Sequence, residues 1–305
     1  MSAYQAPWWL PGRHLQTLYG ALAPAPRVAW RRERWDTPDG DFIDLDWAGG
    51  SGPLLALFHG LEGGSSSHYA RSIAAQAAAR GWRCVVPHFR GCSGVLNRLP
   101  RAYHSGDSEE LDWILRRLKP DFAAGVSLGG NVLLKWLGER GTQAAGIVRR
   151  AVAASAPLDL AASGRALDRG FNRRVYTRLF LTTLKAKAFA RITLHRTPID
   201  ERRLARARTL HEFDDVVTAP LHGFRDADDY WARASSAPWL EHIRVPTLVL
   251  NARNDPFLPE AALERATRKA ASAVLLEFPR SGGHASFPGR RAWLARRVLE
   301  FLGTA

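Results

Sequence analysis

Short, continuously apolar segments alternate with segments of helical periodicity from residue 54 onward, and this alternation limits the possible folds most. A continuous apolar run of about five residues is typical of a strand that is buried on both faces. Such strands occur in parallel sheets that are covered by helices on both sides. The predicted strands are 54–58, 84–87, 122–126, 151–155, 247–251 and 274–278. The sequence therefore predicts an α/β fold with a mostly parallel central sheet flanked by helices.

Two further segments have clear local signals. Residues 30–47 predict a β-hairpin with its turn at Asp39-Gly40, because β-favouring residues follow that dipeptide. Asp107, followed by Glu110, predicts the capped start of a helix.

The strand–helix alternation is interrupted at residues 158–240, where the composition is mostly helical. We expect one domain, 1–305, with 158–240 as a helical cap inserted late in the sheet. Loops after parallel strands gather at the carboxyl edge of the sheet, where open α/β folds bind ligands. The cap is therefore predicted to lie over the ligand site.

The predicted cap is strongly basic. The chain has a net charge of +14, and residues 161–210 hold thirteen Lys and Arg but only Asp168, Asp200 and Glu201 as acidic residues. Such a segment can bind nucleic acid, attract an anionic surface or substrate, or form a solvated face. We expect contact with an anionic membrane rather than with nucleic acid, and leave the solvated face open.

The remaining composition excludes several classes of protein. No run approaches the roughly 18 uncharged apolar residues of a transmembrane helix. Residues 1–16 lack a basic start and a long apolar stretch, so we expect no secretory signal and a cytoplasmic location. Cys84 and Cys92 provide neither a disulfide framework nor a common metal-ligand spacing, so no metal site is expected.

Residues 125–129, GVSLG, match the G-x-S-x-G pattern of a nucleophile elbow. The predicted strand 122–126 ends at Ser127, and an apolar helical segment begins directly after it. Glycines are needed there because the strand and the helix pass closely at a tight turn. Ser127 is therefore the candidate nucleophile.

A serine nucleophile needs a base and an acid that orients the base, and in this fold they follow in the order serine, acid, histidine. Asp255 follows the predicted strand 247–251, and His284 follows the predicted strand 274–278. Both should lie at the carboxyl edge of the sheet, as Ser127 does. Asp159 is the reserve acid. The histidines that precede the serine are weaker candidates: His59, His88 and His104.

An acyl-transfer site also needs hydrogen-bond donors for the oxyanion. One expected donor is the backbone N–H of Leu128, the residue after the serine. The other should come from the glycine-rich loop after strand 54–58, where we favour the N–H of Leu61 and place Gly60 second.

Several segments together resemble the α/β-hydrolase superfamily and, within it, the YheT-like branch (the AB hydrolase 4 family). The matching segments are HLQT, FHGLEGGSSSHYARSIA, HFRGCSG, YHSGD, GVSLGGN, FDDVVTAPLHGF, DYWARASS, NARNDPF and HASF. The resemblance implies the α/β-hydrolase fold, a helical cap and carboxylic-ester hydrolysis without a cofactor. It places the charge-relay residues of the family on Ser127, Asp255 and His284.

We therefore hypothesise a serine esterase that cleaves small-molecule or lipid esters through an acyl-enzyme. An acyltransferase with the same triad and a non-catalytic module that binds membrane or nucleic acid are the alternatives. The aromatic pair Trp8-Trp9 can anchor in lipid or pack onto the domain, and we favour packing. Trp231 and Trp239 line an acyl pocket or merely pack the cap, with neither role favoured. The sequence does not define the oligomeric state.

Overall fold

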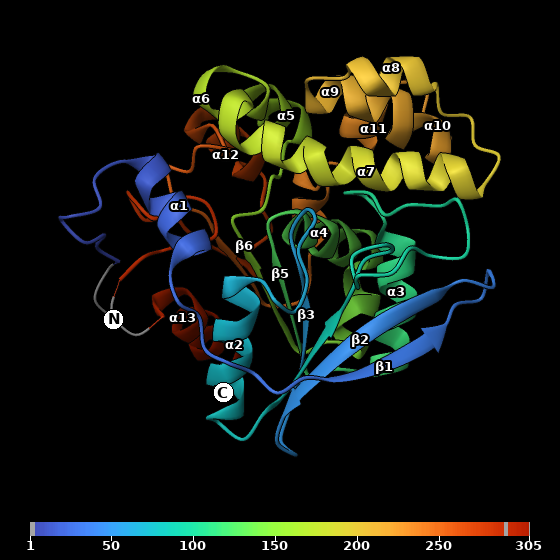
Figure 1. The fold of residues 1–305 in the computed structure, drawn as a ribbon. Helices are drawn as coiled ribbons and strands as arrows, with labels where there is room; N and C mark the ends of the chain where they lie inside the picture. Colours follow the sequence, from blue (N-terminus) through green and yellow to red (C-terminus); the bar gives the residue numbers. More distant parts are fainter. Residues whose placement is uncertain (1–3, 290–291, 305) are drawn as a thin grey trace.

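The computed structural model describes residues 4–289 and 292–304, and an eight-stranded sheet forms its centre (Figure 1). The strand order is β1-β2-β4-β3-β5-β6-β7-β8. The strands are β1 (Arg31–Asp36), β2 (Phe42–Gly49), β3 (Leu54–Phe58), β4 (Arg83–Pro87), β5 (Phe122–Val126), β6 (Arg150–Ala154), β7 (Thr247–Leu250) and β8 (Val274–Glu277). β2 is antiparallel to β1 and β4, and the other neighbouring pairs are parallel. The predicted hairpin and the mostly parallel α/β sheet are confirmed.

Helices cover both faces of this sheet, as its uniformly apolar central strands require. One side contains α2 (His68–Ala78) and α13 (Trp293–Leu302), and the other contains α3 (Ser108–Leu118) and α4 (Leu128–Arg140). Successive residues of β5 are therefore buried on opposite faces: Ala124 packs with α2 and α13, and Ala123 packs with α3 and α4. Three further elements also surround the sheet: α12 (Glu260–Thr267) and the 3₁₀ helices η1 (Gly141–Gly146) and η4 (Ala237–His242).

The chain between β6 and β7 forms a helical layer above the carboxyl edge of the sheet (Figure 1). Its elements are α5 (Leu160–Leu167), α6 (Gly170–Asn172), η2 (Arg173–Thr177), α7 (Arg178–Leu194), α8 (Glu201–Arg206), α9 (Leu210–Phe213), η3 (Asp214–Thr218), α10 (Ala219–His222) and α11 (Ala227–Ala234). The η2 and η3 turns are π-helical. This layer, called the cap below, has an apolar core of its own around Phe213, Val217 and Trp231.

A narrow neck joins the cap to the sheet. The N–H of Leu160 donates to Ser235 Oγ (3.0 Å), so the entering and leaving segments are bonded to each other. The Asn131 side chain, fully buried on α4, donates to the Ala234 carbonyl (2.8 Å) and accepts from the Ser236 N–H (3.0 Å). The neck is therefore tied directly to the helix that follows Ser127.

The helix predicted after Asp107 begins there, but the predicted capping interaction is wrong. Asp107 occupies the N-cap of α3 without a side-chain capping bond. Its carboxylate instead accepts two hydrogen bonds from Arg101 (2.7 and 2.9 Å), and Glu110 accepts one from Arg90 (2.6 Å). Hydrogen bonds from a guanidinium to a carboxylate are stronger than those from a backbone N–H, so the arginines occupy both side chains.

The N-terminal segment also departs from expectation. Trp8 is 91% exposed and Trp9 is half-exposed, so the favoured packing of this pair onto the domain is wrong for Trp8. The Leu10 N–H bonds back to the Pro7 carbonyl (3.0 Å), and this tight turn buries Leu10 while directing Trp8 outward. Helix α1 (Arg13–Leu22) follows. Within the described residues, no helix combines the length and the apolar character needed to cross a membrane.

Candidate active site

Ser127 lies at the junction of β5 and α4 in a backbone conformation that side chains rarely adopt (φ 54°, ψ −122°). Gly125 and Gly129 make this junction possible. A Cβ on Gly125 would overlap the Gly129 carbonyl, and a Cβ on Gly129 would lie 2.5 Å from the Phe58 carbonyl oxygen. The glycines thus let α4 contact β5 and β3 through backbone atoms and present Ser127 at the carboxyl edge of the sheet.

The structure brings Ser127, His284 and Asp255 into one chain of hydrogen bonds. The Ser127 hydroxyl lies 3.0 Å from His284 Nε2, and His284 Nδ1 lies 2.8 Å from Asp255 Oδ2. This order is the one in which Nδ1–H donates to the carboxylate and Nε2 is free to accept the serine proton. The Phe257 N–H donates to Asp255 Oδ1 (2.8 Å), which orients the buried carboxylate.

Asp159, the reserve acid, has a different role. It is the N-cap of α5, and its carboxylate accepts from the Ala162 N–H (2.9 Å). The acid bonded to His284 is Asp255 alone among the described residues.

The loop that carries His284 is held by three side chains that the sequence reasoning did not select. Thr17 Oγ1 accepts from the His284 N–H (2.9 Å), Gln16 Oε1 accepts from the Gly282 N–H (3.0 Å), and Ser155 Oγ accepts from the Ala285 N–H (2.9 Å). Gln16 and Thr17 belong to the HLQT segment on α1. Residues 1–30 show neither a clear helical nor a clear strand periodicity. The HLQT match was therefore the sequence signal that could have identified Gln16 and Thr17.

Backbone donors for an oxyanion are available beside Ser127. The Gly60 N–H donates to the Tyr69 hydroxyl (2.8 Å), and the Glu62 N–H donates to the Tyr103 hydroxyl (2.9 Å). Among the described residues, the N–H groups of Leu61 and Leu128 have no hydrogen-bond partner. Both residues line the same cavity as Ser127. Leu61 is therefore the better candidate of the two considered in this loop.

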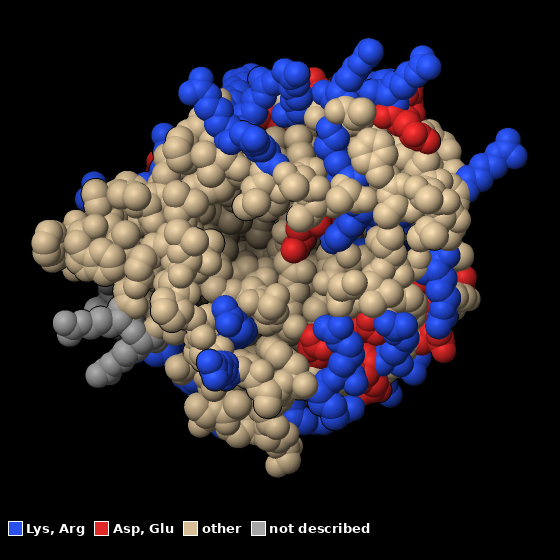
Figure 2. All heavy atoms as spheres, viewed as in Figure 1, with Lys and Arg blue, Asp and Glu red and all other residues tan. Residues whose placement is uncertain are grey.

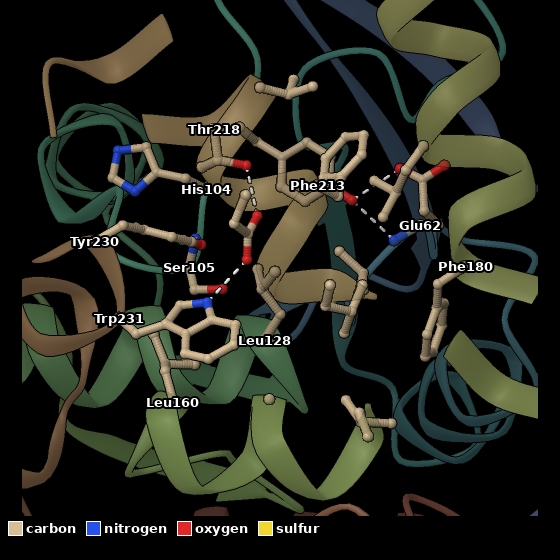
Figure 3. A pocket seen from close by; sticks show the side chains of 18 of the residues that line it. Glu62, His104, Ser105, Leu128, Leu160, Phe180, Phe213, Thr218, Tyr230 and Trp231 are labelled. Carbon is tan, nitrogen blue, oxygen red and sulfur yellow. Dashed lines mark hydrogen bonds between the residues drawn. The ribbon is translucent and has the colours of Figure 1, made fainter. Parts of the chain in front are cut away.

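A mostly apolar cavity of about 130 Å³ extends from Ser127 between the cap and the sheet. One water needs roughly 10–15 Å³, so this space can hold part of a larger ligand. Trp231 and Tyr230 line one side, and Phe180 and Glu62 line the other (Figure 3). Trp239 instead packs against Gly138 of α4. The open question about the two tryptophans is resolved: Trp231 lines the cavity and Trp239 packs outside it.

Two charged groups in the cavity wall are tied to neighbouring elements. Glu62, beside Leu61, forms an ion pair with Lys187 of α7 (2.9 Å) and accepts from the Tyr103 hydroxyl (2.8 Å). Asp214 accepts from the Trp231 indole (2.8 Å) and the Thr218 hydroxyl (2.6 Å), as the dashed lines in Figure 3 show. Burial raises the pKa of Asp214 to about 6.

The two cysteines lie outside this arrangement. Burial raises the pKa of the Cys84 thiol to about 12 and that of the Cys92 thiol to about 11. Neither is therefore a thiolate at neutral pH.

The family model for the alpha/beta hydrolase fold matches residues 53–289, which include strands β3 to β8, the cap and all three residues of the hydrogen-bonded chain. The chain belongs to the α/β-hydrolase family. Among α/β-hydrolases, YheT from Escherichia coli is 38% identical, over 95% of this chain and 90% of its own. Phospholipase ABHD3 from Homo sapiens is 29% identical, over 98% of this chain and 78% of its own. The expected YheT-like branch is thereby confirmed.

Solved α/β-hydrolase structures have the same fold. An esterase from Exiguobacterium antarcticum superposes with a TM-score of 0.60, covering 90% of this chain and all of that chain at 16% identity. A membrane phospholipase A also has a TM-score of 0.60, with 17% identity, and covers 90% of this chain and 87% of that chain. At these identities the likeness concerns the fold alone.

Proposed function

We propose that this chain is a serine hydrolase that cleaves carboxylic esters by way of an acyl-enzyme. The observation that carries the proposal is the hydrogen-bonded chain Ser127–His284–Asp255 beside two unoccupied backbone N–H groups. The names of relatives support the ester as substrate class, since they include a phospholipase and a monoacylglycerol lipase. The apolar lining of the cavity suits an acyl chain.

Each residue has a defined part in the proposed reaction. His284 Nε2 accepts the Ser127 proton as Ser127 Oγ attacks the ester carbonyl carbon. The N–H groups of Leu61 and Leu128 stabilise the oxyanion that forms. His284 then returns the proton to the leaving alcohol oxygen, and the acyl group stays on Ser127. Water, deprotonated by His284, releases the acid and restores the serine.

Asp255 acts through His284 rather than on the substrate. Its carboxylate holds Nδ1 protonated, so that Nε2 faces the serine, and it stabilises the imidazolium formed in each half-reaction.

A direct test combines labelling by a fluorophosphonate with turnover of p-nitrophenyl esters of increasing chain length. Ser127→Ala should abolish labelling and lower kcat by about 10⁴–10⁶-fold, because the nucleophile is absent. Equal turnover by the wild type and Ser127→Ala would refute the role of Ser127, and no turnover or labelling of the wild type would favour a binding module.

Asp255→Asn should lower kcat by about 10⁴-fold, because it favours the wrong tautomer of His284.

Asp159→Asn is the matched control for Asp255→Asn. Asn and Asp are comparably good N-caps, so α5 keeps its cap and kcat should stay near the wild-type value. A large loss of kcat in Asp159→Asn, with a normal kcat in Asp255→Asn, would show that the catalytic acid is Asp159 after β6 rather than Asp255 after β7.

A further inference from the structure

Arg191, on the cap helix α7, is a buried cation without a partner. The residue is only 5% exposed, and its Nη2 is fully buried with no hydrogen bond. In the part of the chain that the structure describes, no hydrogen bond or ion pair reaches its guanidinium. The group packs over Gly91, where a Cβ would lie 2.8 Å from Nη2. A buried charge is costly unless it is paired, and arginine stays charged at any pH that proteins experience.

Two carboxylates whose charges act on Arg191, Glu62 and Asp41, are already bonded to other cations. Glu62 is paired with Lys187, one turn earlier on α7, and Asp41 is paired with Arg90 (3.0 Å). Burial lowers the pKa of Arg191, although Glu62 and Asp41 act in the opposite direction. This wall of the protein therefore has two cations, Lys187 and Arg191, for the single carboxylate of Glu62.

Arg191 and Lys187 both line the cavity that contains Ser127. The other carboxylate in the lining, Asp214, lies beside Trp231, whereas Glu62 lies beside Phe180 on the opposite side (Figure 3). Asp214 already accepts hydrogen bonds from two side chains. The cavity wall therefore has an excess of positive charge on the side formed by α7 and the loop that contains Leu61.

We propose that Arg191, assisted by Lys187, binds an anionic group carried by the ester substrate. A guanidinium offers a planar pair of N–H donors that fits a carboxylate or a phosphate. The substrate class is then an amphiphile with an apolar chain, a scissile ester and an anion within reach of α7. The substrate assignment rests on the proposed function, whereas anion binding at Arg191 does not.

The test uses two pairs of esters that differ by one anionic group. The first pair is 1-octanoylglycerol 3-phosphate and 1-octanoylglycerol, with the anion on the alcohol side. The second is the mono-p-nitrophenyl ester of suberic acid and p-nitrophenyl octanoate, with the anion on the acyl side. In at least one pair, Arg191→Met should lower the ratio of anionic to neutral kcat/KM by about 10- to 100-fold, the effect of losing hydrogen bonds to a charged group. The pair that responds identifies the source of the anion.

Arg178→Met is the matched control, since Arg178 lies exposed on the same helix and the same charge is removed. Its ratio should equal that of the wild type. Arg191→Lys keeps the charge without the planar fork, and its ratio should lie between those of the wild type and Arg191→Met. Unchanged ratios in both pairs, or an equal loss for Arg191→Met and Arg178→Met, would overturn the proposal.

A binding measurement keeps the proposal separate from catalysis. Octyl phosphate contains no carboxylic ester, and calorimetric titration should show about 10- to 100-fold weaker binding to Arg191→Met than to Arg178→Met. If the wild type hydrolyses none of the esters, the proposed function fails while this titration still decides the role of Arg191. Equal affinity of the two variants for octyl phosphate, together with unchanged ester ratios, would leave Arg191 as a structural residue only.

Discussion

Tyr69 and Tyr103 determine which backbone N–H of the loop after β3 can receive an oxyanion. Their hydroxyl groups occupy the N–H groups on either side of Leu61. The sequence favoured Leu61 over Gly60 without a decisive reason, and it gave the two tyrosines no part in that choice. The structure supplies the reason for preferring Leu61: the bonds Gly60–Tyr69 and Glu62–Tyr103 join residues 9 and 41 positions apart, and no local sequence pattern reveals them.

Asp214 gives a pH dependence whose sign follows from its environment. Its pKa is raised from 3.8 to about 6, so the folded state keeps a proton that the unfolded state has already lost between these values. The contribution of Asp214 to stability is therefore full below pH 3.8, falls as pH rises to about 6, and is constant above.

We predict that Asp214→Asn lacks this fall. The free energy of unfolding of the wild type minus that of the variant should decrease by at most about 3 kcal/mol between pH 4 and pH 6.5. Urea unfolding at several pH values measures it, and the lost Trp231 contact adds only a constant offset. A difference that is flat or rises with pH would contradict the prediction.

At the scale of elements, the sequence predicted the central strands of the parallel core well, because burial on both faces leaves an unbroken apolar run such as LLALF or FAAGV. The expected burial of strand 274–278 is wrong for Leu275 and Leu276, which are exposed because β8 lies at the edge of the sheet. The sequence also placed Ser127, Asp255 and His284, since each follows such an apolar run. The support from α1 was not foreseeable, because Gln16 and Thr17 contact a loop more than 260 residues away. The two π-helical turns of the cap likewise have no local signal.

The close contact of α4 with β3 leads to a prediction about Gly129. In Gly129→Ala the new Cβ would lie 2.5 Å from the Phe58 carbonyl oxygen and 2.6 Å from that of His59, so α4 must move away. We expect a loss of about 1–3 kcal/mol in the free energy of unfolding and slower fluorophosphonate labelling of Ser127.

Gly146→Ala is the control for that experiment. Gly146 lies in η1, and no atom lies within 4 Å of the position of its Cβ. Its urea midpoint and labelling rate should match the wild type, whereas equal behaviour of Gly129→Ala and Gly146→Ala would show that the elbow tolerates a side chain.

At the scale of the whole molecule, exposed apolar residues and basic residues adjoin. Trp8, Trp9 and Leu22 are exposed around α1, and the His14 ring lies 4.3 Å from the Phe171 ring at the start of the cap. Arg173 and Arg174 follow Phe171 closely and line a surface groove. Lys and Arg gather over the cap in Figure 2. We propose that this surface contacts anionic membranes, with the tryptophans entering the interface.

Binding to vesicles that contain phosphatidylglycerol should therefore depend on both features. The double variant Trp8→Ala/Trp9→Ala and the double variant Arg173→Glu/Arg174→Glu should each cosediment less than the wild type. Binding should also weaken between 0.1 M and 1 M salt, because the screening length falls from ~10 Å to ~3 Å. Leu275→Ala removes an exposed apolar side chain on β8 and should have no effect. Binding that is indifferent to salt and to both double variants would leave the basic face as solvated surface.

The neck between the cap and the sheet has a consequence for how such enzymes diversify. The entering and leaving segments bond to each other and to Asn131, so the interval from Leu160 to Ala234 begins and ends at one fixed junction. Side-chain contacts such as Lys187–Glu62 and Asn172–Pro256 also join it to the rest of the molecule. Ser127, Asp255 and His284 lie outside this interval, so a recombination event that replaces it and keeps the junction leaves the three residues themselves unchanged, while the new interval has to restore those contacts. Substrate specificity can thus evolve through the cap while the residues that carry out the reaction stay the same.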